Sequence, residues 1–196
     1  MRFCSIASGS SGNCIYVGSD NTHVLVDIGI SGKKMETGLN SLELTGRDLD
    51  GILITHEHSD HIKGLGVISR KYGIPIYATA GTVDAMVRTN ALGKIPEGIF
   101  HEIQEDEPFM INDLKVNPFT IPHDAAQPVG YRLEHEGHSV GIATDLGKYN
   151  DYIIENLQGL DALLLEANHD IRMLQVGKYP YYLKQRILGD LSLIHI

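Results

Sequence analysis

The feature of this sequence that most constrains its fold is the hexapeptide at residues 56–61, His-Glu-His-Ser-Asp-His, which directly follows a short apolar run. Three imidazoles and one carboxylate in so short a segment supply nearly all the ligands of a two-metal site. In an extended segment alternate side chains project to the same side, so His56, His58 and Asp60 can converge while His61 faces elsewhere. One segment can therefore serve two neighbouring ions.

Imidazole with carboxylate suits zinc best among the common cellular metals and also admits manganese or iron. Composition alone would give His-x-His-x-Asp-His in about two of every thousand chains of this length. The alternative is a solvated histidine-rich turn, but such turns rarely stand between an apolar strand and a helical pattern. We therefore expect two divalent metal ions, with zinc as the first choice.

Length and composition favour one compact domain. With 196 residues and 42% hydrophobic content, the chain can bury a substantial core. No apolar stretch approaches the ~18 residues needed to cross a membrane, and we find no signal-peptide pattern. Cys4 and Cys14 form neither a disulfide framework nor a Cys-x-x-Cys site, which fits a reducing compartment. A cytoplasmic location is expected.

The formal net charge of −9 bears on the possible partners. Nonspecific binding to a nucleic acid rests largely on Lys and Arg neutralising phosphates, so the overall charge has the wrong sign for it. Two divalent ions would bring about four positive charges to the place where a phosphate must sit. The charge therefore opposes tight nonspecific binding and leaves phosphoester chemistry open.

The apolar periodicity predicts alternating strands and helices, which is typical of a layered α/β architecture. Strands are expected at residues 3–8, 13–17, 22–26, 51–54, 74–77, 108–111, 114–121, 129–133, 139–143 and 162–165. Helices are expected near residues 31–42, 62–68, 82–87, 149–157 and 182–188, with Ser31 and Thr82 as N-caps. Residues 100–136 read as an antiparallel meander.

Polar side chains follow five of these apolar runs. They are Asp27, His56, Asp145, Glu166 and the pair His123 and Asp124. Strand ends gathered at one edge make a rigid platform for a site, so we expect these five termini to meet. The turn at residues 8–13, Ser-Gly-Ser-Ser-Gly-Asn, lets the backbone approach a ligand, although a plain hairpin turn explains Ser10 and Ser11 equally well.

Taken together, these residues resemble the metallo-β-lactamase superfamily, whose fold is a four-layer αββα sandwich with a two-metal site on one edge. More narrowly, the chain is similar to the WalJ/YycJ-like branch. The matching segments are residues 8–13, 55–66, 123–126, 143–145, 166–170 and 179–180. The resemblance implies a single domain of this fold over residues 1–190, followed by a non-matching tail at 191–196.

The resemblance also implies a ligand set. His56, His58 and His123 would hold one ion, Asp60 and His61 the second, and Asp145 would bridge both. Asp27 either accepts a hydrogen bond from a ligand imidazole or caps a turn, and the sequence favours neither. The three remaining candidates lie in polar, turn-rich surroundings and are expected on the surface: His101, His135 and His138.

The activity implied is metal-dependent hydrolysis by a metal-bridging hydroxide. Asp60 would orient the hydroxide or take its proton. His169 would contact a phosphate or protonate a leaving group, although a structural role fits it equally well. The branch implies a phosphodiesterase, a 5′-to-3′ exonuclease acting on DNA. The alternatives are a small-molecule hydrolase acting on a cyclic phosphodiester or thioester, and a catalytically impaired fragment.

A catalytically impaired fragment is considered because family members continue past Gly189 into a segment with a later histidine for the second ion. Here the sequence after Gly189 departs from that pattern, so the C-terminal part of the fold is expected to be missing. On this reading one ion binds tightly and the other weakly, and the fold exposes apolar surface or a bare strand edge.

Overall fold

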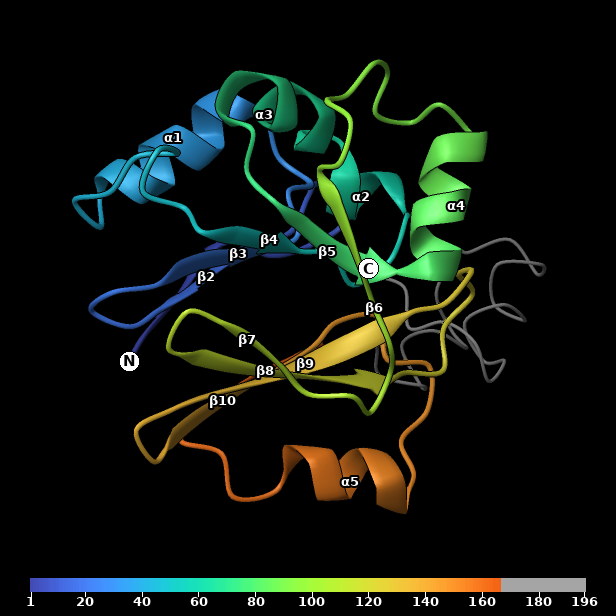
Figure 1. Cartoon of the computed structure of the whole chain (residues 1–196). Coiled ribbons are helices and arrows are strands. Elements are labelled where there is room, and N and C mark those ends of the chain that lie inside the picture. Colours follow the sequence, from blue (N-terminus) through green and yellow to red (C-terminus); the bar gives the residue numbers. More distant parts are fainter. Residues whose placement is uncertain (167–196) are drawn as a thin grey trace, which may run out of the picture.

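The computed structural model describes residues 1–166 as a mixed α/β sandwich (Figure 1). The strands are β1 (Arg2–Ala7), β2 (Cys14–Gly18), β3 (His23–Val26), β4 (Gly51–Leu53), β5 (Ile76–Thr79), β6 (Phe100–Ile103), β7 (Phe109–Ile111), β8 (Leu114–Thr120), β9 (Val129–His135), β10 (His138–Ala143) and β11 (Ala162–Leu165). The helices are α1 (Gly32–Asn40), α2 (Ser59–Ile62), α3 (Leu65–Tyr72), α4 (Ala80–Arg88) and α5 (Asp151–Leu157). The predicted helix at 182–188, His169 and the tail at 191–196 lie outside the described residues.

The strands form two sheets. The first has the order β1-β2-β3-β4-β5-β6 and the second the order β11-β10-β9-β8-β7. Strands β3 to β6 run parallel, and the helices between them carry the chain back across one face of the sheet. In the second sheet β7 to β10 are antiparallel, and β11 lies parallel to β10. The carboxyl ends of β3, β4 and β5 therefore meet at one edge.

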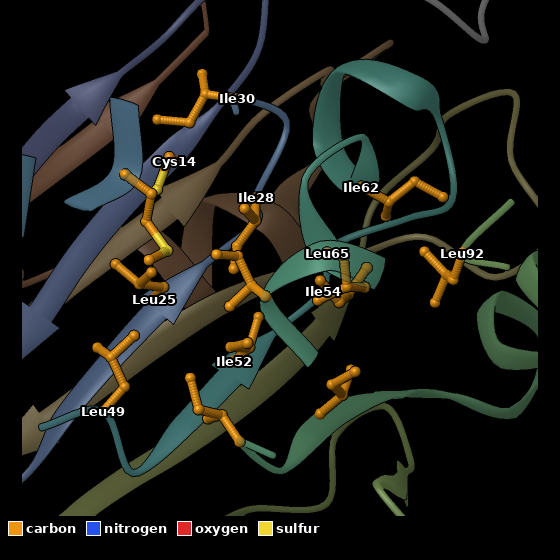
Figure 2. Packing of buried hydrophobic residues seen from close by; sticks show 14 of the residues in the cluster. Cys14, Leu25, Ile28, Ile30, Leu49, Ile52, Ile54, Ile62, Leu65 and Leu92 are labelled. Atoms are coloured by element: carbon orange, nitrogen blue, oxygen red, sulfur yellow. The ribbon is translucent and has the colours of Figure 1, made fainter. Parts of the chain in front are cut away.

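The layers follow the order helices, sheet, sheet, helix, as the sequence predicts. Figure 1 shows α1 to α4 on the outer face of the first sheet and α5 on the outer face of the second. Alternation along the strands divides the apolar side chains: Leu25, Ile52 and Ile54 face the helices, and Figure 2 shows this packing. Val24, Val26 and Leu53 face the second sheet instead. A third cluster, including Phe119 and Ile153, lies between that sheet and α5.

The single helix predicted at residues 62–68 is wrong, because the segment forms two helices that are interrupted at Gly64. A Cβ atom on Gly64 would lie only 2.1 Å from the Ile30 carbonyl oxygen, and the Gly64 amide donates to the Ile28 carbonyl. The break therefore comes from a loop distant in the sequence. None of the helices within residues 1–166 combines the length and the hydropathy needed to cross a membrane.

Three further predictions need correction. The residue capping α4 is Thr79 rather than Thr82, because the helix begins at Ala80. The segment at 100–103 is not part of the meander, since β6 pairs in parallel with β5 in the first sheet. Strand β11, predicted to be buried, alternates instead, with Leu163 41% and Leu165 46% exposed.

Candidate metal centre

The backbone of the hexapeptide changes from extended to helical part-way along, and this change decides where its side chains point. Strand β4 ends at Leu53, His58 has extended backbone angles as the N-cap of α2, and the chain is helical over Ser59–Ile62. The extended alternation that led us to expect His61 to face elsewhere therefore ends before that residue. The helical turn returns His61 to the cluster, with its ring centroid 4.0 Å from that of His56.

Three imidazoles form the first group of converging donors. One nitrogen each from His56, His58 and His123 lies within 4.8 Å of the others. His123 comes from the loop after β8, in the second sheet, and its Nε2 lies 3.1 Å from His58 Nδ1. The ligand loop of the first sheet and the β8 loop of the second thus meet at this edge of the sandwich.

A second group overlaps the first. His56, His61 and Asp145 also bring their donor atoms within 4.8 Å of one another. Asp145 Oδ2 lies 2.8 Å from His61 Nε2 and 3.7 Å from His56 Nε2. Asp60 stands at the rim of this group, with Oδ2 3.6 Å from His61 Nε2.

His56 carries the clearest sign that the cluster suits a cation. Its ring is fully buried, and within the described part of the chain its Nε2 has no hydrogen-bond partner. Burial lowers the pKa of His56 well below its ordinary value, and the neighbouring His61, His123 and His58 lower it further. A neutral imidazole with an unused buried nitrogen is the form that binds a metal ion, so the residues present fit the group that the fold implies.

Asp27 contacts a ligand imidazole, which is the first of the two roles that the sequence left open, and it also bonds the loop after β4. Its Oδ2 lies 2.7 Å from His61 Nδ1, and its Oδ1 accepts a hydrogen bond from the Thr55 amide at 2.9 Å. The carboxylate therefore accepts a hydrogen bond from Nδ1–H of His61 and directs Nε2 toward the cluster. Burial opposes protonation of His61, but Asp27 and Asp145 outweigh it and raise its pKa to about 10. A cation entering at Nε2 must therefore displace a proton.

Both aspartates that end inner strands have left-handed backbone. The φ angle is 61° at Asp27, after β3, and 54° at Asp145, after β10. Non-glycine residues rarely adopt this conformation, and aspartate tolerates it better than most. The conformation turns each carboxylate back toward the histidines instead of continuing the strand.

Two residues at this edge hold the others in place, and our reading of the sequence assigned neither a role. Thr55 donates its hydroxyl to Asp27 Oδ2 at 2.8 Å, and its carbonyl accepts from the Val129 amide at 3.0 Å. Glu166, at the end of β11, accepts a hydrogen bond from the Asp145 amide. The available signal was position alone, since each stands beside a predicted ligand or at a strand end.

Known proteins with similar sequences place this chain in a family. The model of the "Beta-lactamase superfamily domain" matches residues 22–183. The chain belongs to the metallo-β-lactamase superfamily. Exodeoxyribonuclease YycJ of Bacillus anthracis is 41% identical over 192 residues, which cover 98% of this chain and 72% of that protein. Exodeoxyribonuclease WalJ of Streptococcus pneumoniae (strain D39) is also 41% identical, over 98% of this chain and 71% of its own length.

Solved structures show the same metallo-β-lactamase fold. Zn²⁺-bound PqqB from Methylobacterium extorquens superimposes with a TM-score of 0.67 at 18% identity, covering 94% of this chain and 68% of that one. The metallo-β-lactamase fold protein YhfI from Bacillus subtilis gives 0.66 at 19% identity, covering 83% and 66%. At these identities the likeness concerns the fold, and it confirms the predicted sandwich.

The structure brings most of the predicted site residues together at one edge. The described members are Asp27, His56, His58, Asp60, His61, His123 and Asp145, with Glu166 beside them. Asp124, predicted to join them, is exposed. His101 and His138 are exposed as predicted, whereas the side chain of His135 is only 15% exposed and contacts the Asp113 carbonyl.

Proposed function

We propose that the clustered histidines and aspartates bind two divalent cations, with zinc as the first choice and manganese or iron as alternatives. One ion would be held by His56, His58 and His123. The other would be held by His61 and Asp60, and both would share Asp145. The observation that carries this proposal is the overlap of two donor groups around the buried Nε2 of His56, which has no hydrogen-bond partner among residues 1–166.

The proposed reaction is hydrolysis of phosphodiester bonds in DNA, as a 5′-to-3′ exonuclease. Its support is the 41% identity over 98% of the chain to proteins named exodeoxyribonucleases. A chain with a net charge of −9 attracts a polyanion poorly at long range. Binding of DNA is therefore expected to depend on the cationic edge of the sandwich, which makes it local and metal-dependent.

When bound, two cations would lower the pKa of a water molecule and stabilise negative charge on the reacting phosphate. Asp60 is partly exposed at the rim, with 29% of its side chain accessible, and would orient that water and accept its proton at Oδ2. Asp27 keeps His61 in the tautomer that frees Nε2. The proposed role of His169, contact with a phosphate or protonation of a leaving group, concerns a residue outside the described part of the chain.

The test uses metal-loaded protein and a 5′-labelled DNA duplex. We expect release of labelled nucleotides from the wild type and its loss in Asp145→Asn and His58→Ala. The exposed His138 lies at the opposite edge, so His138→Ala serves as the matched control and retains activity. Wild-type rates in the two site variants would refute the assignment. Turnover of a cyclic phosphodiester or a thioester without release of nucleotides would refute the nuclease and favour a small-molecule hydrolase.

A further inference from the structure

The turn at residues 8–13 lies against the metal centre and has no part in the roles given above. Its geometry depends on glycine: Gly12 has a φ of 136°, and a Cβ atom there would lie 2.4 Å from the Gly29 carbonyl oxygen. The Gly12 amide donates to the Gly9 carbonyl at 2.8 Å, which closes the turn. The turn can therefore pack closely against the loop after β3, and Asn13 at its end lies beside the site.

The backbone of Asn13 is bonded to two loops that carry site residues. Its amide donates to the Asp60 carbonyl at 2.8 Å, and its carbonyl accepts from the Gly29 amide at 2.8 Å. The approach is so close that a Cβ atom on Gly29 would lie 1.5 Å from the Asp60 carbonyl oxygen. Asn13 itself has no exposed surface. Its position is thus fixed relative to the ligand loop.

The side chain of Asn13 is fixed as well. Its Oδ1 accepts a hydrogen bond from the Gly9 amide at 2.9 Å, so the amide group cannot turn over without losing that bond. The Nδ2 group consequently faces His61 Nε2 at 3.1 Å. The same Nε2 lies 2.8 Å from Asp145 Oδ2, inside the second donor group. A buried N–H donor is therefore directed at the place where the second ion is proposed to bind.

We infer that Asn13 donates a hydrogen bond to a phosphate oxygen of the substrate held at the second ion. The inference rests on the two-metal site proposed above and adds to it a residue that contacts the substrate. A zinc ion on His61 Nε2 would lie about 2.0–2.1 Å from that nitrogen. Because Asn13 Nδ2 lies 3.1 Å from the same nitrogen, it would stand next to the other groups bound to the ion. An N–H group cannot ligate a cation. Without an ion, the hydrogen-bond partner of Nδ2 is His61 Nε2, and an ion on that nitrogen would remove this partner. An oxygen of a phosphate held at the ion would replace it, and donors fixed in advance stabilise such charge without reorganising.

The sharpest variant is Asn13→Asp, which keeps the volume and the acceptor for the Gly9 amide and replaces only the donor by an oxygen. Asn40→Asp makes the same chemical change at an exposed position on α1 and is the matched control. Both are loaded with Co²⁺, the metal content is measured, and inorganic phosphate is titrated while the visible spectrum is followed. Activity on DNA is then measured separately.

We expect Asn13→Asp to retain its metal and to bind phosphate at least about tenfold more weakly, with turnover lower by about 10²–10³-fold, the loss typical of one oxyanion donor. Asn40→Asp is expected to match the wild type. Should the buried carboxylate prevent folding, Asn13→Ala gives the same readouts and the same expected direction. Unchanged phosphate binding at full metal content would overturn the inference, and so would loss of the metal itself. Failure of the wild type to retain metal would instead refute the proposed function, so the two failures can be told apart.

Discussion

Both edges of the sandwich have polar side chains that join the two sheets, but these side chains are paired differently at the two edges. At the edge away from the histidines, Asp113 in the β7–β8 turn accepts hydrogen bonds from the hydroxyls of Ser19 and Thr22 and, at 3.4 Å, from Asn21. The Thr22 and Ser19 hydroxyls are the main reason that the pKa of Asp113 falls to about 2. These partners come from the turn between β2 and β3, so the cluster joins one sheet to the other.

At the histidine edge the contact between the sheets is made by imidazoles, and within residues 1–166 the buried Nε2 of His56 has no hydrogen-bond partner. His56, His58 and His123 crowd their rings within 4.9 Å, measured between centroids, and burial disfavours charge on His56. Left-handed backbone occurs at both edges, at Asp27 and Asp145 here and at Asn112 and Glu136 in the turns of the other, so it does not distinguish them. One edge therefore joins the sheets through its own hydrogen bonds, whereas at the other we expect a cation to complete the contacts.

The largest effect is expected from Asp145→Asn. The substitution leaves the fold in place but removes the negative charge of the second donor group, on the carboxylate proposed to be shared by both ions, so nucleotide release is expected to fall by about 10²–10³-fold or more. Labelled duplex and metal-loaded protein provide the measurement. A rate within a few-fold of the wild type would show that the two edges do not differ in the way described.

A smaller effect, on zinc affinity, is expected from Asp27→Asn. The Asn side chain still accepts from the Thr55 N–H, but it presents its own N–H to His61 Nδ1. The ring must then carry its proton on Nε2, the nitrogen proposed to bind the metal. We expect zinc affinity to fall by about 10–100-fold, measured by competition with a chelating dye. Asp84→Asn, on the exposed face of α4, is the control. Equal affinities in the two variants would remove Asp27 from the account.

A still smaller effect is expected at Glu57, whose Oε1 accepts a hydrogen bond from the Ala126 amide at 2.9 Å. This bond ties the ligand loop to the loop that carries His123. We expect Glu57→Ala to weaken zinc binding by about fivefold, in keeping with the loss of one hydrogen bond. Glu57→Gln keeps the acceptor and is expected to restore the affinity. A Gln variant as weak as the Ala variant would show that charge, not positioning, is what matters.

The change with the least effect on activity is expected to be Asp113→Asn, which weakens the opposite edge. Because folding lowers the pKa of this carboxyl, its contribution to stability is present above the unfolded value of about 3.9 and is lost as pH falls toward about 2. Denaturant titrations at several pH values should show the wild type more stable near neutrality and the difference narrowing below about pH 4. Activity per folded molecule is expected to stay at the wild-type level. A large loss of activity would contradict the division between the edges.

The sequence predicted the strands and the meeting of their polar ends because both depend on local patterns. Alternation placed Leu25 and Val26 on opposite faces, and the ligands stand where apolar runs stop. The helix break at Gly64 was not predictable in this way, since its cause is the Ile30 carbonyl. The parallel pairing of β6 likewise depends on tertiary packing. The return of His61 required knowing that the extended segment ends at His58, and nothing local marks the left-handed φ of Asp27 and Asp145.

The most direct test of the central claim is a calorimetric titration of metal-free protein with zinc, carried out on the wild type and on His123→Ala. We expect the wild type to bind two equivalents, with release of a proton as zinc reaches His61, and His123→Ala to lose one of the two binding events. Failure of the wild type to bind zinc, or an identical titration in the variant, would contradict that claim.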